Sequence, residues 1–148
     1  MKFFHSHYNK EEGISSVIMK HLGADFIGNA HVHPDDKEKA SEYMGGAIAE
    51  TRAVIKALKY ERKLLKENAE VCRKFIKACE CYKGWDPESP TARAAYRQLN
   101  RRIKAVNDIT DEINDRMFNL ERHIWKRDAL LTKLAKYKQN KLKDNSEN

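Results

Sequence analysis

Two long stretches of the chain repeat apolar residues at alternating steps of four and three, and no other feature of the sequence constrains the fold as strongly. The first stretch runs from Met44 to Cys79 and the second from Ala92 to Leu134. Alternating steps of four and three place residues along one side of an α-helix that packs against another helix. The pattern therefore predicts two long helices, at about residues 35–82 and 90–139.

Residues typical of helix boundaries stand at both ends of these stretches. Pro34-Asp35-Asp36 puts two carboxylates at the positive end of the first helix dipole. Between the helices, Ser89 is the predicted N-cap and Pro90 the predicted first residue of the second helix. The apolar pattern is lost near the end of the chain, so residues 143–148 are expected to form a frayed tail.

The short connection between the two helices makes them antiparallel neighbours. Matching the two stretches outward from this connection pairs Leu65 with Val106 and Leu58 with Ile113, and the residue numbers of successive pairs keep a nearly constant sum. We therefore expect a mainly α protein of one domain, in which residues 35–142 form a long antiparallel two-helix coiled-coil hairpin.

The first 34 residues differ from the rest, because they hold five of the six histidines and three of the six glycines. Their pattern favours a strand at Lys2–His7, a short helix from Ile14 to Leu22 that ends at Gly23, and a strand at Asp25–His33. Residues 1–34 are thus predicted to form a small N-terminal cap of mixed α and β structure.

A second apolar stripe runs beside the first one on both helices. Its members are Val54, Leu64, Val71, Phe75, Ala78, Tyr82, Ile109, Phe118, Trp125 and Leu130. A two-helix hairpin has little interior, so another surface must cover this stripe. A homodimer that forms a four-helix bundle is the expected arrangement.

Lysine and arginine exceed aspartate and glutamate by 29 to 22, and the resulting net charge of +7 favours acidic partners. No acidic residue lies between Thr91 and Ala105. The candidate residues for contacts with nucleic acid or a protein partner are Arg73, Lys74, Lys77, Trp85, Arg93, Arg97, Arg101 and Arg102. The guanidinium and ammonium groups would contact phosphates and the indole would stack on a base. The alternative is a basic helix face that is simply solvated.

Two His-x-His motifs suggest a different chemistry. His5 and His7 share one side of a strand, as do His31 and His33, so two such strands side by side would present four imidazoles to one zinc ion. This alternative is a metal-binding module or a small metallo-hydrolase. The preferred interpretation requires no cofactor.

One segment resembles a pattern found in uncharacterised phage and prophage proteins. Residues 28–36 and then Gly45, Ala49, Arg52 and Ala53 are similar to G-x-A-x-C-H-P-D-D followed by G-x-x-x-A-x-x-R-A. Val32 stands where that pattern has cysteine, and two extra residues follow the aspartates. The resemblance implies a phage-type origin and no particular activity. From the residues themselves, Gly45 and Ala49 would allow close packing, and Arg52 would be available to an anion.

These observations favour a non-catalytic phage-type interaction protein that binds nucleic acid or a nucleoprotein complex. A counter-defence inhibitor such as an anti-CRISPR would fit the size and charge. A structural homo-oligomeric scaffold or assembly factor is a further alternative. We expect no small-molecule substrate, because long two-helix hairpins provide few concave pockets. We expect no membrane association, because no segment approaches the roughly 20 apolar residues that a membrane helix needs. The expected location is the cytoplasm, in the bacterial host if the gene belongs to a phage.

Overall fold

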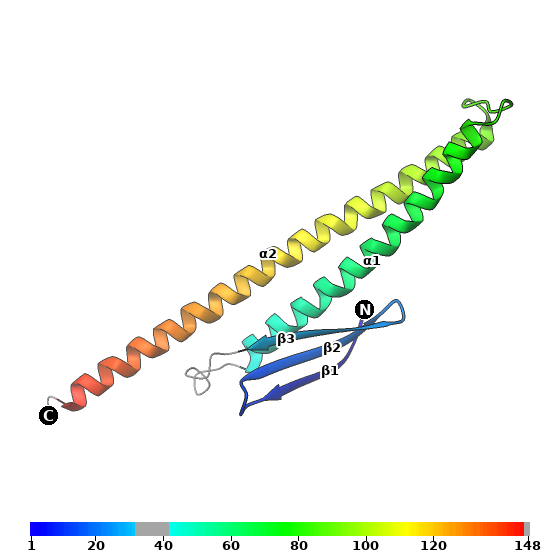
Figure 1. Cartoon of the computed structure of the whole chain (residues 1–148). Coiled ribbons are helices and arrows are strands. Elements are labelled where there is room, and N and C mark those ends of the chain that lie inside the picture. The colour runs from blue at the N-terminus through cyan, green and yellow to red at the C-terminus, as the bar shows by residue number, and fades with distance from the viewer. Residues whose placement is uncertain (32–41, 147–148) are drawn as a thin grey trace. The chain divides into compact units, whose positions relative to one another are not determined.

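The computed structural model describes residues 1–31 and 42–146. A three-stranded antiparallel sheet in the order β1-β2-β3 comes first and two long helices follow (Figure 1). The elements are β1 (Lys2–Asn9), β2 (Ile14–His21), β3 (Ala24–His31), α1 (Glu42–Glu80) and α2 (Pro90–Ser146). The prediction of a mainly helical chain with a small N-terminal cap is confirmed at this level.

Residues 14–22 do not form the predicted helix. Residues 14–21 are the central strand β2, in which Val17 pairs with Ser6 of β1 on one side and Gly28 of β3 on the other. Apolar residues at 14, 17 and 18 suit one face of a helix, but this segment is also rich in β-branched residues. Pairing on both sides decides between the two structures, so the described part of the cap is a sheet rather than mixed α and β structure.

Two tight turns set the register of this sheet. Leu22 and Gly23 join β2 to β3 with φ values of 50° and 79°. Positive φ at both central residues is typical of a type I′ turn, whose twist matches that of paired strands. Between β1 and β2, the Asn9 side chain accepts hydrogen bonds from the backbone N–H groups of Glu11 and Glu12, at 3.1 and 3.2 Å. Both turns arise from local sequence.

The described chain divides into two compact units. The first comprises Met1–Ala57 and Asp115–Asn148, and the second comprises Leu58–Asn114. The boundaries fall within α1 and α2, so each helix contributes to both units.

In the first unit, small residues bring the sheet close to α1. A methyl group on Gly28 would lie 1.9 Å from the backbone oxygen of Ala49, and one on Gly45 would lie 2.4 Å from Oγ of Ser15. Met19 of β2 and Ile48 of α1 are fully buried. The close packing expected at Gly45 and Ala49 is therefore present.

In the second unit, the start of α2 matches the sequence prediction. Oγ of Ser89 accepts a hydrogen bond from the backbone N–H of Ala92 at 3.2 Å, and Pro90 is the first helical residue. A serine N-cap of this kind stabilises a helix by roughly 1 kcal/mol. The buried apolar residues of this unit are Leu58, Ala69, Cys72, Ile76, Ala92, Ile109 and Ile113.

Helix ends differ in part from the predicted ones. Helix α1 ends at Glu80, close to the predicted residue 82, whereas its predicted start and the caps at Pro34-Asp35-Asp36 lie outside the described residues. Helix α2 continues to Ser146, beyond the predicted end at 139 and into the predicted tail. No glycine or proline follows Pro90, and the terminal segment is rich in lysine, a good helix former. The helix has no breaker that would end it earlier.

Candidate functional site

The basic residues predicted to bind a partner lie on both helices of the second unit, but their local surroundings differ. Arg93 donates to the Glu88 carboxylate at 2.6 Å, and Arg73 donates to Glu70 at 2.7 Å. These two guanidiniums are partly neutralised by neighbours on the same chain. Lys74 and Lys77 lie exposed on α1. The eight predicted residues therefore do not act as one uniform patch.

Three arginines instead line one open groove of about 710 Å³ in the second unit. Arg97 and Arg101 are exposed and lie one helical turn apart on α2, and Arg102 lies beside them. We call this groove the arginine groove. The other lining residues are Leu65, Asn68, Ala94, Gln98 and Ala105, so none of the described residues around the groove carries a carboxylate.

Arg102 is oriented by the opposite helix. Its Nη1 donates to the backbone oxygen of Asn68 on α1 at 2.8 Å. Arg97 and Arg101 have no ion-pair partner within residues 1–31 and 42–146. A guanidinium has five N–H donors arranged in a planar fork that matches carboxylate and phosphate oxygens. Over the described residues, the groove thus combines one ordered guanidinium with two that have no ion-pair partner, and no acidic side chain belongs to its lining.

Trp85, the predicted stacking group, packs within the chain. Its ring meets that of Tyr96 edge-on, with ring centres 6.4 Å apart and an angle of 72° between the planes. The Tyr96 hydroxyl donates to Oε1 of Glu80 at 2.7 Å, and this hydrogen bond raises the pKa of Tyr96. Trp85 is half-buried, whereas Tyr82 is 74% exposed. Tyr82 is therefore the better placed of these aromatic groups to meet a partner.

The candidate metal ligands are divided between separate strands. His5 and His7 lie on β1 and His31 lies on β3, with β2 between these two strands. His33 lies outside the described residues. The side-by-side arrangement of the two His-x-His strands, on which the zinc prediction depended, is absent from the sheet. Among the described residues, no three His, Cys, Asp or Glu side chains are grouped closely enough to hold a metal ion.

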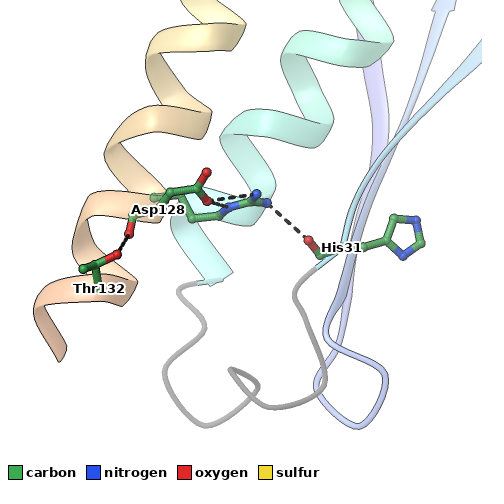
Figure 2. Close-up of polar contacts among 4 residues, drawn as sticks. His31, Asp128 and Thr132 are labelled. Atoms are coloured by element: carbon green, nitrogen blue, oxygen red, sulfur yellow. Dashed lines mark hydrogen bonds and ion pairs between the residues drawn. The ribbon is translucent and has the colours of Figure 1, made fainter. Parts of the chain in front are cut away.

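Basic side chains from both helices cap the outer edge of β3, which the sequence did not indicate. The backbone oxygens of residues 27, 29 and 31 accept hydrogen bonds from Lys56, Arg52 and Arg127, at 2.6, 2.5 and 3.2 Å respectively. Arg52, expected to be available to an anion, therefore binds a backbone carbonyl. Figure 2 shows the contact to the His31 carbonyl, with the His31 imidazole pointing away from the α2 segment that carries Asp128.

The second apolar stripe is partly used inside the chain. Val54 and Ile109 are buried, but Phe75 is 63% exposed and Trp125 is 70% exposed. Further exposed members of the stripe are Val71, Ala78, Tyr82, Phe118 and Leu130. The stripe therefore leaves aromatic surface uncovered in each of the two units.

Comparisons with protein-family models, with curated proteins and with solved structures found no match to this chain. Neither α1 nor α2, over their described lengths, is long and apolar enough to cross a membrane.

Proposed function

We propose that the chain is a non-catalytic binding protein whose arginine groove contacts the phosphates of a nucleic acid. The observation that supports this function is the pair of exposed guanidiniums at Arg97 and Arg101, which have no carboxylate partner among the described residues. Two exposed guanidiniums of this kind interact most favourably with a ligand that carries negative charges at repeated positions.

The arrangement of donors suits a phosphate backbone better than a single small anion. Arg101 follows Arg97 by four helical positions, a rise of about 6 Å along the axis. The groove is open rather than enclosed, so an extended ligand can lie along it. Contacts of this type position a nucleic acid without reading its bases. Binding should therefore show little sequence preference.

The proposed architecture around the groove is the antiparallel coiled-coil hairpin. Two contacts between the helices support this arrangement in the second unit, namely Arg102 to Asn68 and Tyr96 to Glu80. From the first contact to the second, the residue number falls from 102 to 96 on α2 and rises from 68 to 80 on α1. Opposite directions of this kind are consistent with antiparallel helices. The hairpin would hold the arginine groove on a rigid surface.

The direct test compares two double variants of identical charge change. Arg97→Glu with Arg101→Glu reverses the groove, whereas Lys59→Glu with Lys63→Glu reverses two exposed lysines at the same spacing on α1. Affinity for labelled single-stranded and double-stranded oligonucleotides is measured by fluorescence anisotropy, with circular dichroism as a check on folding. We expect at least a tenfold loss of affinity for the arginine variant and a much smaller loss for the lysine variant.

Equal losses in the two double variants would show that net charge alone drives binding, and would refute the groove assignment. Absence of nucleic-acid binding by the unaltered chain would refute the proposed function. A pull-down from phage-infected bacterial lysate, with and without nuclease, would then test the nucleoprotein and counter-defence interpretations. A CRISPR effector or another nuclease retained after nuclease treatment would favour an inhibitor.

A structural homo-oligomer is the second candidate, favoured by the exposed aromatic residues of the apolar stripe. Phe75 in the second unit and Trp125 in the first are each large side chains with most of their surface in water. A second copy that covers the stripe would complete the proposed four-helix bundle. Replacement of both residues by serine should then lower the mass in solution, as measured by light scattering, without loss of helix.

A further inference from the structure

The two outer edges of the sheet differ in how many of their backbone groups are hydrogen-bonded by side chains. On β3, the carbonyls of residues 27, 29 and 31 each accept a hydrogen bond from a basic side chain of α1 or α2. Such capping satisfies the unpaired backbone groups that an edge strand otherwise offers to another chain. The capped edge is therefore unavailable for strand pairing, which leaves the edge formed by β1.

The alternation of the antiparallel ladder identifies the backbone groups at this second edge. The carbonyls of residues 27, 29 and 31 on β3 point away from β2. The alternate residues Gly28 and Ala30 therefore form the backbone hydrogen bonds to Val17 and Ser15 of β2. Residues 14, 16 and 18 of β2 then face β1 and pair with Asn9, His7 and His5. Ser6 and Tyr8 are left with N–H and C=O groups that point away from the sheet.

None of the described side chains forms a hydrogen bond with these outward groups. Ser6 is exposed, and neither Ser6 nor Tyr8 has a hydrogen-bond partner outside the sheet among the described residues. Beside them, an open groove of about 680 Å³ separates β1 from the start of α1, with Tyr43 and Glu50 on its helical wall. The lining also includes Ser15, Ser16 and Val17 of β2, so the groove lies between α1 and the inward face of β1 and β2, and α1 does not pack closely against this part of β1.

His5 and His7 share the face of β1 that points away from α1. Residues alternate along a strand, and Ser6 is the neighbour of the inward-facing Val17. The two imidazoles are stacked with ring centres 6.2 Å apart and planes 12° apart, and both residues are exposed. One strand thus presents two aligned metal ligands, whereas a closed zinc site requires four.

We infer that two copies of this chain pair through their β1 edges and bind one zinc ion between them. In the antiparallel register centred on Ser6, the two Ser6 residues form a hydrogen-bonded pair through their outward N–H and C=O groups. His5 of each copy then lies opposite His7 of the other in non-hydrogen-bonded pairs, where Cα atoms are only about 4.5 Å apart. Four imidazoles from two copies lie together on one face of a six-stranded sheet.

A second copy is the occupant that the residues favour over a foreign strand. The outward hydrogen-bonding groups of Ser6 are self-complementary about a two-fold axis, as a symmetric dimer interface requires. The same axis doubles the number of imidazoles from two to four and completes a tetrahedral ligand set. A strand of unrelated sequence would satisfy the backbone but leave the zinc half-coordinated. His31, on the capped edge, takes no part.

The test measures mass and metal content together. The full chain is stripped with EDTA, dialysed, and titrated with zinc chloride while its mass is followed by light scattering. Zinc should double the mass of the starting species, at one bound ion per two chains, and EDTA should reverse the change. His5→Gln and His7→Gln should each raise the zinc concentration for half-conversion more than tenfold. Loss of a direct ligand costs at least as much as the roughly 10–100-fold loss seen for outer-shell partners.

Two further variants separate this interface from nonspecific zinc binding and from association through another surface. His31→Gln is the matched control, because this residue is also an exposed histidine on the sheet but lies on β3, and it should leave the zinc response unchanged. Ser6→Pro removes an outward N–H without breaking the ladder to β2, since proline is tolerated on an edge strand. It should abolish the doubling of mass while circular dichroism stays unchanged.

Several results would overturn the inference. Zinc bound at one ion per chain without a change in mass would place the site within a single copy. A loss of response in His31→Gln equal to that in His5→Gln would indicate nonspecific histidine binding. A zinc-dependent doubling of mass that persists in both β1 histidine variants would assign the zinc-dependent interface to another surface.

Discussion

The salt dependence of nucleic-acid binding gives the sharpest test of the arginine groove. Each phosphate contact contributes about −0.9 to the slope of log affinity against log salt concentration on double-stranded DNA. Three contacts, from Arg97, Arg101 and Arg102, would contribute a slope of about −2.7. Replacement of Arg97 and Arg101 by glutamine should leave about −0.9. Between about 50 and 200 mM salt, the loss of affinity should then fall from about 40-fold to about 3.5-fold.

The assay is a fluorescence anisotropy titration of a labelled duplex at four salt concentrations, repeated for the glutamine variant. Lys59→Gln with Lys63→Gln serves as control, because these exposed lysines carry the same charge on α1 and do not line the groove. The predicted difference in slope, about 1.8, does not depend on contacts made elsewhere. A weaker affinity with an unchanged slope would refute direct phosphate contact by Arg97 and Arg101.

Three other predictions concern the scaffold that carries these surfaces. Gly28→Ala should destabilise the chain by about 1–3 kcal/mol, because the added methyl group meets the α1 backbone at 1.9 Å. Gly46→Ala, where a methyl group meets nothing within 4 Å, should instead stabilise α1 by about 0.5–1 kcal/mol; thermal melts compare the two. Ser89→Ala removes the cap of α2 and should cost roughly 1 kcal/mol in urea unfolding, whereas Ser89→Thr should cost less. Glu80→Gln should lower the pKa of Tyr96 in an NMR titration of labelled tyrosine, because the carboxylate accepts a hydrogen bond from the hydroxyl and so favours the neutral phenol.

The sign of the last effect follows from proton linkage. A folded-state pKa raised above the unfolded value of 10.0 means that the folded chain holds this proton more tightly. The contribution to stability is complete below pH 10.0 and is lost as the pH rises through the folded-state pKa of Tyr96. A pKa of Tyr96 that does not change in Glu80→Gln would contradict this assignment. Equal stability changes in the two glycine variants would contradict the close contact between β3 and α1.

Local signals predicted the parts of this chain that depend on local interactions. The alternating steps of four and three identified both helices, and Ser89-Pro90 identified the start of α2 to the residue. A helix is stabilised by bonds between residues close in sequence, so its period and its caps can be recognised without knowledge of the rest of the fold. The end of α2 was harder to predict, because no breaker follows and terminal helix depends on weak propensities.

The sheet shows where local signals were insufficient. Residues 14–21 suit either a helix or a strand, and the choice was made by hydrogen bonds to β1 and β3. The zinc prediction placed two His-x-His strands side by side, whereas β2 separates β1 from β3. Strand order depends on pairing between distant segments, so sequence spacing does not reveal it.

Composition and periodicity were enough to establish two long helices, a small histidine-rich cap and a basic surface on α2. Tertiary structure alone decided which charges are engaged and which are open. Arg52 and Arg127 cap an edge strand, Arg93 is paired with Glu88, and Arg97 and Arg101 have no acidic partner among the described residues. Every arginine carries the same charge in the sequence, but its effect depends on the carboxylates and carbonyls within a few ångströms, and folding determines these neighbours.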